Sequence, residues 1–154
     1  MNGTRIAFGG LAAGLVLLAS GIVVGHGVLG PDYVRAFASH RAHPVSAATV
    51  IENTAIRLAF GFLVVFLYAA FRPRFGAGPR TAAIAAVFFW VSAYLPRFFE
   101  LSDFGILGGW RLAVSVPWSL AEVLLAALLG GWIYREDPVT GGHAARREGH
   151  ERQT

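Results

Sequence analysis

Four long apolar runs dominate the sequence, and segments rich in proline, glycine and charge separate them. The runs extend over residues 6–29, 47–71, 81–99 and 107–134. Each has enough residues to cross the hydrocarbon core of a bilayer as an α-helix, which takes about 20. Because the connections are short, we expect neighbouring helices to be antiparallel. The pattern predicts an all-α fold, an integral membrane four-helix bundle with short loops.

The composition supports a single membrane domain. Of the 154 residues, 55% are hydrophobic and 14% are charged, which is too apolar for a soluble domain with a polar surface. We expect residues 1–136 to form the transmembrane domain and residues 137–154 to form a polar cytoplasmic tail. The chain contains no cysteine, which excludes disulfides and thiolate-based metal or redox sites.

Arginine supplies all 13 basic residues, a bias that favours a GC-rich bacterial genome and hence the bacterial cytoplasmic (inner) membrane. The arginines near the span ends divide unequally between the two sides. Eight lie on one side: Arg5, Arg72, Arg74, Arg80, Arg135, Arg146, Arg147 and Arg152. Four lie on the other: Arg35, Arg41, Arg97 and Arg111. The positive-inside rule predicts that both termini are cytoplasmic, and because the arginines set topology, no nucleic-acid partner is expected.

Two charged residues lie near the middle of apolar runs. Arg57 lies fourteen residues before the end of the second run at Phe71, and Glu122 lies twelve before the end of the fourth at Tyr134. At 1.5 Å per residue, these positions lie about 21 and 18 Å from the same side of the membrane. A lone arginine at that depth costs about 3 kcal/mol or more. We therefore expect Arg57 and Glu122 to pair.

Polar and small side chains recur at spacings of three and four around both charges, which places them on one stripe of each helix. A polar stripe in a membrane helix faces protein or water and not lipid. We expect an intramembrane polar cluster of these residues: Thr49, Asn53, Arg57, Ser115, Ser119 and Glu122.

Four glycines of the first run, Gly10, Gly14, Gly21 and Gly25, fall on one face at about 100° per residue. They form two small-xxx-small steps, which allow another helix to approach closely. We predict a helix-packing face here, with a substrate path along the same face as the alternative.

A further cluster is expected near the outer ends of the third and fourth runs: Trp90, Tyr94, Arg97, Glu100 and Arg111. Arg97 can extend outward, stack on the rings or pair with Glu100 at i+3. Such a cluster is typical of interfacial anchoring, and a functional role is the alternative.

The connection between the first two runs predicts a short interfacial helix. Gly30-Pro31-Asp32 has the pattern of a helix start. Tyr33 and Phe37 then form an apolar edge at i, i+4, which suits a helix lying at the membrane surface.

No residue pattern indicates catalysis. His40 and His43 have an H-x-x-H spacing, but two histidines in a short loop are a weak metal signal. His26, near the outer end of the first run, gives little support for haem or pigment ligation. No G-x-S-x-G motif, phosphate-binding glycine loop or intramembrane aspartate occurs. We expect no catalytic residue, no metal and no cofactor.

Two stretches carry a resemblance to a known group of proteins. They are FLYAAFRPRFGAGPR, residues 66–80, and GGWIYRE, residues 130–136. They resemble the inner turn and the tyrosine-arginine-glutamate exit of a family of small uncharacterised bacterial four-span integral membrane proteins. The resemblance covers about the last two-thirds of the chain. It implies the same architecture and no particular activity.

Two classes of function fit these observations best. The first is a non-catalytic accessory or scaffolding subunit of a larger membrane complex, for example an energy-converting one, or a homo-oligomer; its partners are membrane lipid and other membrane subunits or further copies. The second is a small ion- or proton-coupled transporter or channel that uses Glu122 and Arg57 in a polar path. A third reading, a lipid- or pigment-binding partner of an enzyme, rests on the aromatic content and His26. The lack of catalytic motifs favours the first.

Overall fold

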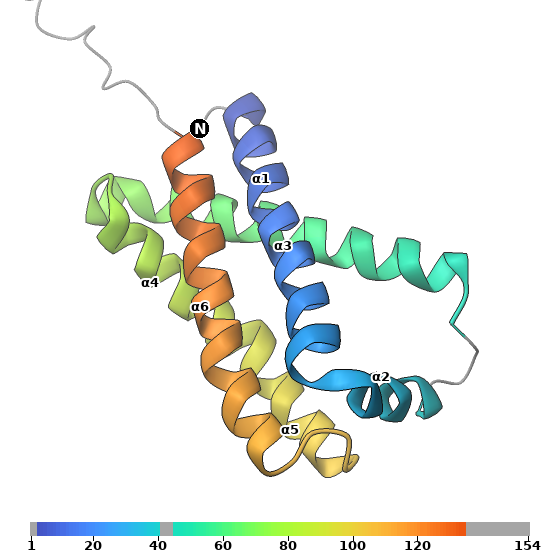
Figure 1. Ribbon diagram of the computed structural model, residues 1–154. Helices are drawn as coiled ribbons and strands as arrows, with labels where there is room; N and C mark the ends of the chain where they lie inside the picture. Colours follow the sequence, from blue (N-terminus) through green and yellow to red (C-terminus); the bar gives the residue numbers. More distant parts are fainter. Residues whose placement is uncertain (1–2, 41–44, 135–154) are drawn as a thin grey trace, which may run out of the picture.

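The computed structural model describes residues 3–40 and 45–134, and helices make up nearly all of this part of the chain (Figure 1). In chain order the elements are α1 (Gly3–Ile22), the π-helix η1 (Val23–Val28), α2 (Gly30–Ser39), α3 (Ala47–Phe75), α4 (Pro79–Phe89), the π-helix η2 (Trp90–Tyr94), α5 (Leu95–Asp103) and α6 (Trp110–Ile133). No strand occurs among the described residues. The predicted tail, residues 137–154, lies outside them.

Four helices are long and apolar enough to cross a membrane. They are Gly3–Val28, Ala47–Phe75, Pro79–Asp103 and Trp110–Ile133, so α1 continues through η1, and α4 continues through η2 into α5. They pack against one another, which confirms the predicted all-α membrane fold with four spans. The start of α1 and the end of α6 lie together at one end of the molecule, which we term the N-terminal end (Figure 1).

Both π-helices lie just before a proline. A proline ring clashes with the carbonyl of the residue four positions earlier, and proline lacks the N–H that would bond it. For Pro31 that residue is Gly27 in η1, and for Pro96 it is Ser92 in η2. In both segments the N–H at the end reaches back five residues, from Leu29 to the Val24 oxygen and from Leu95 to the Trp90 oxygen. At Pro96 the wider turn accommodates the proline inside the third span, whereas Pro31 lies beyond the end of the first span, after the break at Gly30 (φ 80°).

The short helix predicted between the first two spans is present as α2. Pro31 lies in its first turn, where the missing N–H costs nothing, and Asp32 provides a negative charge near the helix N-terminus. The rings of Tyr33 and Phe37 lie 6.2 Å apart on its apolar edge. There they pack against a small buried cluster that contains Leu29 and Leu107.

Glycines bring the backbones of α1 and α3 close together. A Cβ added to Gly61 of α3 would lie 2.1 Å from the backbone nitrogen of Gly14, and one on Gly14 would lie 2.8 Å from the Leu58 Cα. Gly10 lies equally close to Phe62. Such approaches exclude any side chain at these positions. Figure 1 shows α3 crossing α1 and α6 at a wide angle, with its N-terminal part reaching away from the other helices.

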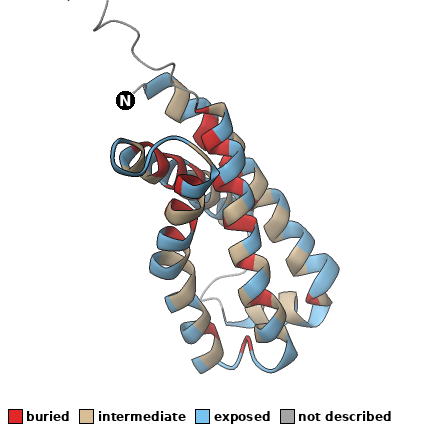
Figure 2. Ribbon diagram, turned by 90° about the vertical axis from the view of Figure 1, so that its left-hand side faces the viewer, coloured by how far each residue is buried: buried red, intermediate tan, exposed pale blue. Residues whose placement is uncertain are grey.

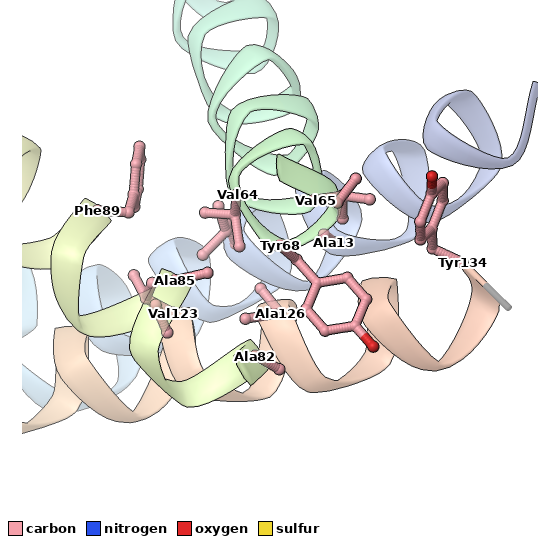
Figure 3. Packing of buried hydrophobic residues seen from close by; sticks show 14 residues of the cluster. Ala13, Val64, Val65, Tyr68, Ala82, Ala85, Phe89, Val123, Ala126 and Tyr134 are labelled. Carbon is pink, nitrogen blue, oxygen red and sulfur yellow. The ribbon is translucent and has the colours of Figure 1, made fainter. Parts of the chain in front are cut away.

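The main core lies where α1, α3, α4 and α6 meet, and it is built largely from small residues. Ala13, Val64, Ala85 and Ala126 are fully buried within it (Figure 3). Larger apolar side chains point outward instead: Phe8 is 66% exposed and Leu125 is 61% exposed. Buried residues thus follow the faces that the helices turn toward one another, and exposed residues cover the outside (Figure 2). Small residues inside and large apolar residues outside are expected for a bundle surrounded by lipid.

The α1–α3 contact leads to a first prediction. Gly61→Ala should lower the free energy of unfolding by about 1–3 kcal/mol, because the new methyl group meets the backbone of α1. Gly25→Ala is the matched control, since nothing lies within 4 Å of a Cβ at Gly25. Unfolding in mixed micelles, followed by circular dichroism, measures both variants. Equal stability of the two variants would contradict this view of the interface.

Candidate functional site

Arg57 lies where α1, α3 and α6 meet. Its Nη1 donates a hydrogen bond to the backbone oxygen of Leu17 on α1 at 2.9 Å, and the same atom lies 3.4 Å from Oε1 of Glu122 on α6. The two charges that the sequence places at matching depths therefore form an ion pair. One guanidinium group joins three helices that are far apart in the sequence.

The first helix is shaped to receive this guanidinium group. A Cβ on Gly21 would lie 2.6 Å from Nη2 of Arg57, so the absence of a side chain leaves room for the arginine. Of the glycines predicted to form a packing face, Gly10 and Gly14 lie against α3, Gly21 lies against Arg57, and Gly25 has no neighbour within 4 Å of a Cβ position. The face thus ends at the ion pair.

Glu122 is the most deeply buried charge of the site. Its side chain is 5% exposed, whereas that of Arg57 is 32% exposed. Among the described residues, no hydrogen bond of standard geometry reaches the buried Oε2 of Glu122 or the hydroxyl of the buried Ser115, but the Tyr94 hydroxyl interacts with the Glu122 carboxylate. A buried polar group without a partner carries a desolvation cost of about 1–3 kcal/mol.

The π-helix η2 adds aromatic groups to this site. Trp90, at its start, donates its indole N–H to Oγ of Ser119 at 2.8 Å, and Ser119 in turn donates to the Val116 oxygen. Tyr94, at its end, packs against Phe60 and Phe89 with ring centroids about 6 Å apart. The sequence interpretation placed Trp90 and Tyr94 in an outer interfacial cluster. The structure instead brings Trp90 to the polar stripe of α6.

Two residues of the predicted polar cluster lie away from the ion pair. Thr49 belongs to the start of α3, where it and Ser46 form a reciprocal capping box. Asn53 is exposed and donates to the Thr49 oxygen of its own helix at 2.8 Å. Both lie on the part of α3 that leaves the bundle (Figure 1). The side chains that the structure gathers are Arg57, Ser119 and Glu122, with Ser115 buried on the same stripe of α6.

The charged members of the predicted outer cluster form local contacts. Arg97 and Glu100 pair at 3.5 Å with more than half of each side chain exposed, and the Arg111 guanidinium lies 5.8 Å from the Trp110 ring centre. Nearby, on α2, burial raises the pKa of the Tyr33 hydroxyl above its usual value. The positive charges of Arg97 and Arg57 oppose that rise in pKa.

One cross-helix contact was not predicted from the sequence. The indole N–H of Trp118 on α6 donates to Oγ of Ser20 on α1 at 2.8 Å. A tryptophan inside an apolar run is itself a signal, because a buried indole N–H needs an acceptor. Trp118 and Trp90 both lie within apolar runs, and each donates its indole N–H to a serine hydroxyl.

The histidines do not gather into a ligand set. Within residues 3–40 and 45–134, no group of three or more metal-ligating side chains occurs. His26 is exposed in η1, and the His40 ring lies 2.8 Å from the Ala36 oxygen of its own helix. His43 lies outside the described residues.

The ion pair leads to a second prediction. Arg57→Leu should lower the free energy of unfolding by about 3–5 kcal/mol, because it leaves the buried Glu122 carboxylate uncompensated, and Glu122→Leu should lower it less, because Arg57 is 32% exposed and keeps its bond to Leu17. The double replacement should recover much of that loss. Chemical unfolding in micelles measures the coupling energy. A double variant no more stable than the worse single variant would show that the residues are not partners.

A matched control is available in the same chain. Arg97 and Glu100 form an ion pair of nearly the same length, but both side chains are more than half exposed. Replacing them singly and together by leucine should give a coupling energy of about 0–1 kcal/mol. A similar coupling for both pairs would contradict a special role for burial at Arg57 and Glu122.

Three comparisons with known proteins were made, against family models, curated proteins and solved structures, and none found a match.

Proposed function

We propose that this chain is a non-catalytic integral membrane protein, an accessory or scaffolding subunit that assembles with other membrane subunits or with further copies of itself. One observation carries the proposal: the guanidinium of Arg57 bonds the α1 backbone at Leu17 and pairs with Glu122 of α6. The guanidinium and the carboxylate, whose transfer into a membrane costs the most free energy of any side-chain groups here, thus hold helices together. That use suits a rigid scaffold.

The other intramembrane hydrogen bonds support the same view. Trp90 joins η2 to α6 through Ser119, and Trp118 joins α6 to α1 through Ser20. Bonds of this kind between transmembrane helices contribute about 0.6 kcal/mol each on average. Together with the ion pair, they connect each of the four spans to at least one other.

We place the protein in the bacterial cytoplasmic membrane with both termini on the cytoplasmic side. The uneven distribution of arginine between the two sides of the spans supports this orientation. At the N-terminal end, Arg72 and Arg74 close α3 and Arg80 opens α4.

The N-terminal half of α3 is the surface that best fits a partner helix. Between residues 47 and 56, all side chains except those of Thr49 and Thr54 are exposed. Ile51 is 69% exposed, and Glu52 and Asn53, the next two residues, are exposed on other sides of the helix. Exposed polar side chains such as Glu52 and Asn53 favour contact with other protein over lipid, because lipid offers no hydrogen-bond partner for groups that their own helix leaves unsatisfied.

Photo-crosslinking tests this assignment. A crosslinking amino acid in place of Ile51, in the full chain at native expression level, should give a discrete adduct with one membrane protein or a second copy. Phe8 on α1, 66% exposed, is the matched control and should give mainly lipid adducts. The gently solubilised protein should also be larger than a monomer by native mass spectrometry. A monomer without an Ile51 adduct would overturn the proposal.

A second candidate function is a small ion- or proton-coupled transporter. The observation that favours it is the deeply buried carboxylate of Glu122, on the same stripe of α6 as the buried Ser115, about two helical turns away. Buried carboxylates in membrane spans commonly mark proton or ion pathways. Arg57, one-third exposed, would connect such a site to its surroundings.

Flux measurements distinguish the two candidates. If the protein transports protons or cations, Glu122→Gln should abolish flux in proteoliposomes, because the amide cannot release a proton or balance a cation. If the protein is a scaffold, wild-type and Glu122→Gln proteoliposomes should both show only the leak of empty vesicles. Wild-type flux that Glu122→Gln leaves unchanged would exclude a carboxylate-based mechanism.

A further inference from the structure

The N-terminal half of α3, residues 47–56, which we term the arm, carries an exposed carboxylate. Glu52 takes part in no hydrogen bond or ion pair among the described residues. It lies beyond the first turn of α3, which contains no acidic residue, so the helix dipole stabilises its charge little. An acidic side chain in a membrane span normally has a partner. Glu52 therefore calls for a hydrogen-bond donor outside its own copy of the chain.

The π-helix η1 carries an exposed imidazole in a similar setting. His26 takes part in no hydrogen bond or ion pair among the described residues. The neighbouring bases on α2 are already engaged, because Arg35 pairs with Asp32 at 2.6 Å and the His40 ring lies 2.8 Å from a backbone oxygen of its own helix. Imidazole has an N–H to donate to a carboxylate in its neutral form and two when protonated. His26 is therefore chemically complementary to Glu52.

The arm and η1 are connected through α2 but do not cover each other. Only residue 29 separates η1 from α2, and residues 40–46 separate α2 from the arm. Nevertheless, α3 has no extended packing contact with η1 or with α2. Figure 1 shows the arm reaching away from the other helices. Within one copy of the chain, Glu52 and His26 do not meet.

Both polar groups lie on apolar surfaces. Ile22 and Val23, before His26, are 58% and 52% exposed, and Ile51 and Ile56 of the arm are 69% and 43% exposed. Lipid can cover these apolar side chains, but it offers no hydrogen-bond partner for an imidazole or a carboxylate. A second protein surface is needed for the polar groups alone.

We propose that two copies of this chain associate, with the arm of each copy packed against η1 of the other and Glu52 bonded to His26 of the partner subunit. A two-fold axis repeats the same contact, because an isologous interface brings residue i of one copy to residue j of the other and the reverse. Each copy supplies one donor and one acceptor, so a pair of copies leaves neither group unsatisfied. The inference rests on the proposed scaffolding function and names a second copy as the partner of the arm.

Charge exchange tests the contact in the full chain, with the dimer fraction measured by native mass spectrometry in micelles. His26→Glu should weaken the dimer about tenfold, because it opposes two carboxylates, and Glu52→Arg should also weaken it. A mixture of the two single variants should form a heterodimer in preference to either homodimer, since one contact then joins glutamate to arginine and the other is native. Asp103→Arg, which reverses another exposed carboxylate, is the matched control and should leave the dimer unchanged.

Disulfide formation tests the same contact without changing its charges in both copies. The chain has no cysteine, so introduced thiols are the only ones present. Mixed Glu52→Cys and His26→Cys proteins should form a covalent dimer under mild oxidation, whereas either variant alone should form little. Phe8→Cys, at an exposed position on α1 away from η1, replaces His26→Cys in the control and should give little product.

The outcomes separate this inference from the proposed function. Equal disulfide yields in the test and control mixtures would overturn the inference, and so would a mixture of charge variants that shows no preference for the heterodimer. An Ile51 crosslink to a different membrane protein, with no second copy, would overturn the inference and leave the accessory-subunit proposal standing. A monomer without any Ile51 adduct would overturn both.

Discussion

The cost of placing a guanidinium group inside a membrane governs the arrangement of this protein. Arg57 cannot face lipid, so α3 must approach both α1 and α6 at one depth, where a carbonyl and a carboxylate are available. Gly21 leaves room for the guanidinium, and Gly14 and Gly61 let the backbones of α1 and α3 approach closely enough. The glycine contacts and the ion pair therefore act together to fix the positions at which α3 crosses α1 and α6.

Pro96 adds a second constraint, which acts on the part of the third span that faces Ser119 and Glu122. Pro96 widens the preceding turn into η2, and this π-helix holds both Trp90 and Tyr94. Trp90 then reaches Ser119, one helical turn from Glu122 on α6. π-Segments within membrane helices are frequently found at functional sites. Here the segment places aromatic side chains around a buried carboxylate, which excludes lipid from it.

Much of the fold and part of the site could be predicted from the sequence. Span number and the pairing of Arg57 with Glu122 depend on hydropathy and depth, which are properties of position along the chain. Thr49 and Asn53 were expected beside the pair because helical periodicity places them on the same stripe as Arg57. Periodicity cannot reveal that the N-terminal part of α3, which carries both residues, reaches away from the other helices (Figure 1). That depends on the angle at which α3 crosses its neighbours, and the angle is set by close contacts between the helices. Trp90 was misplaced because a π-turn changes the register that regular helix geometry assumes.

The ion pair is one of two places where α3 is fixed against α6. At the end of α3, the rings of Tyr68 and Tyr134 meet edge to face, and the Tyr68 hydroxyl accepts a hydrogen bond from the Gly78 N–H of the following turn. Arg57 lies about three helical turns before Tyr68 on the same helix and pairs with Glu122. Contacts at two separate points along a pair of helices restrict both the distance between the helices and the angle at which they cross. An arrangement restricted in this way favours a rigid scaffold.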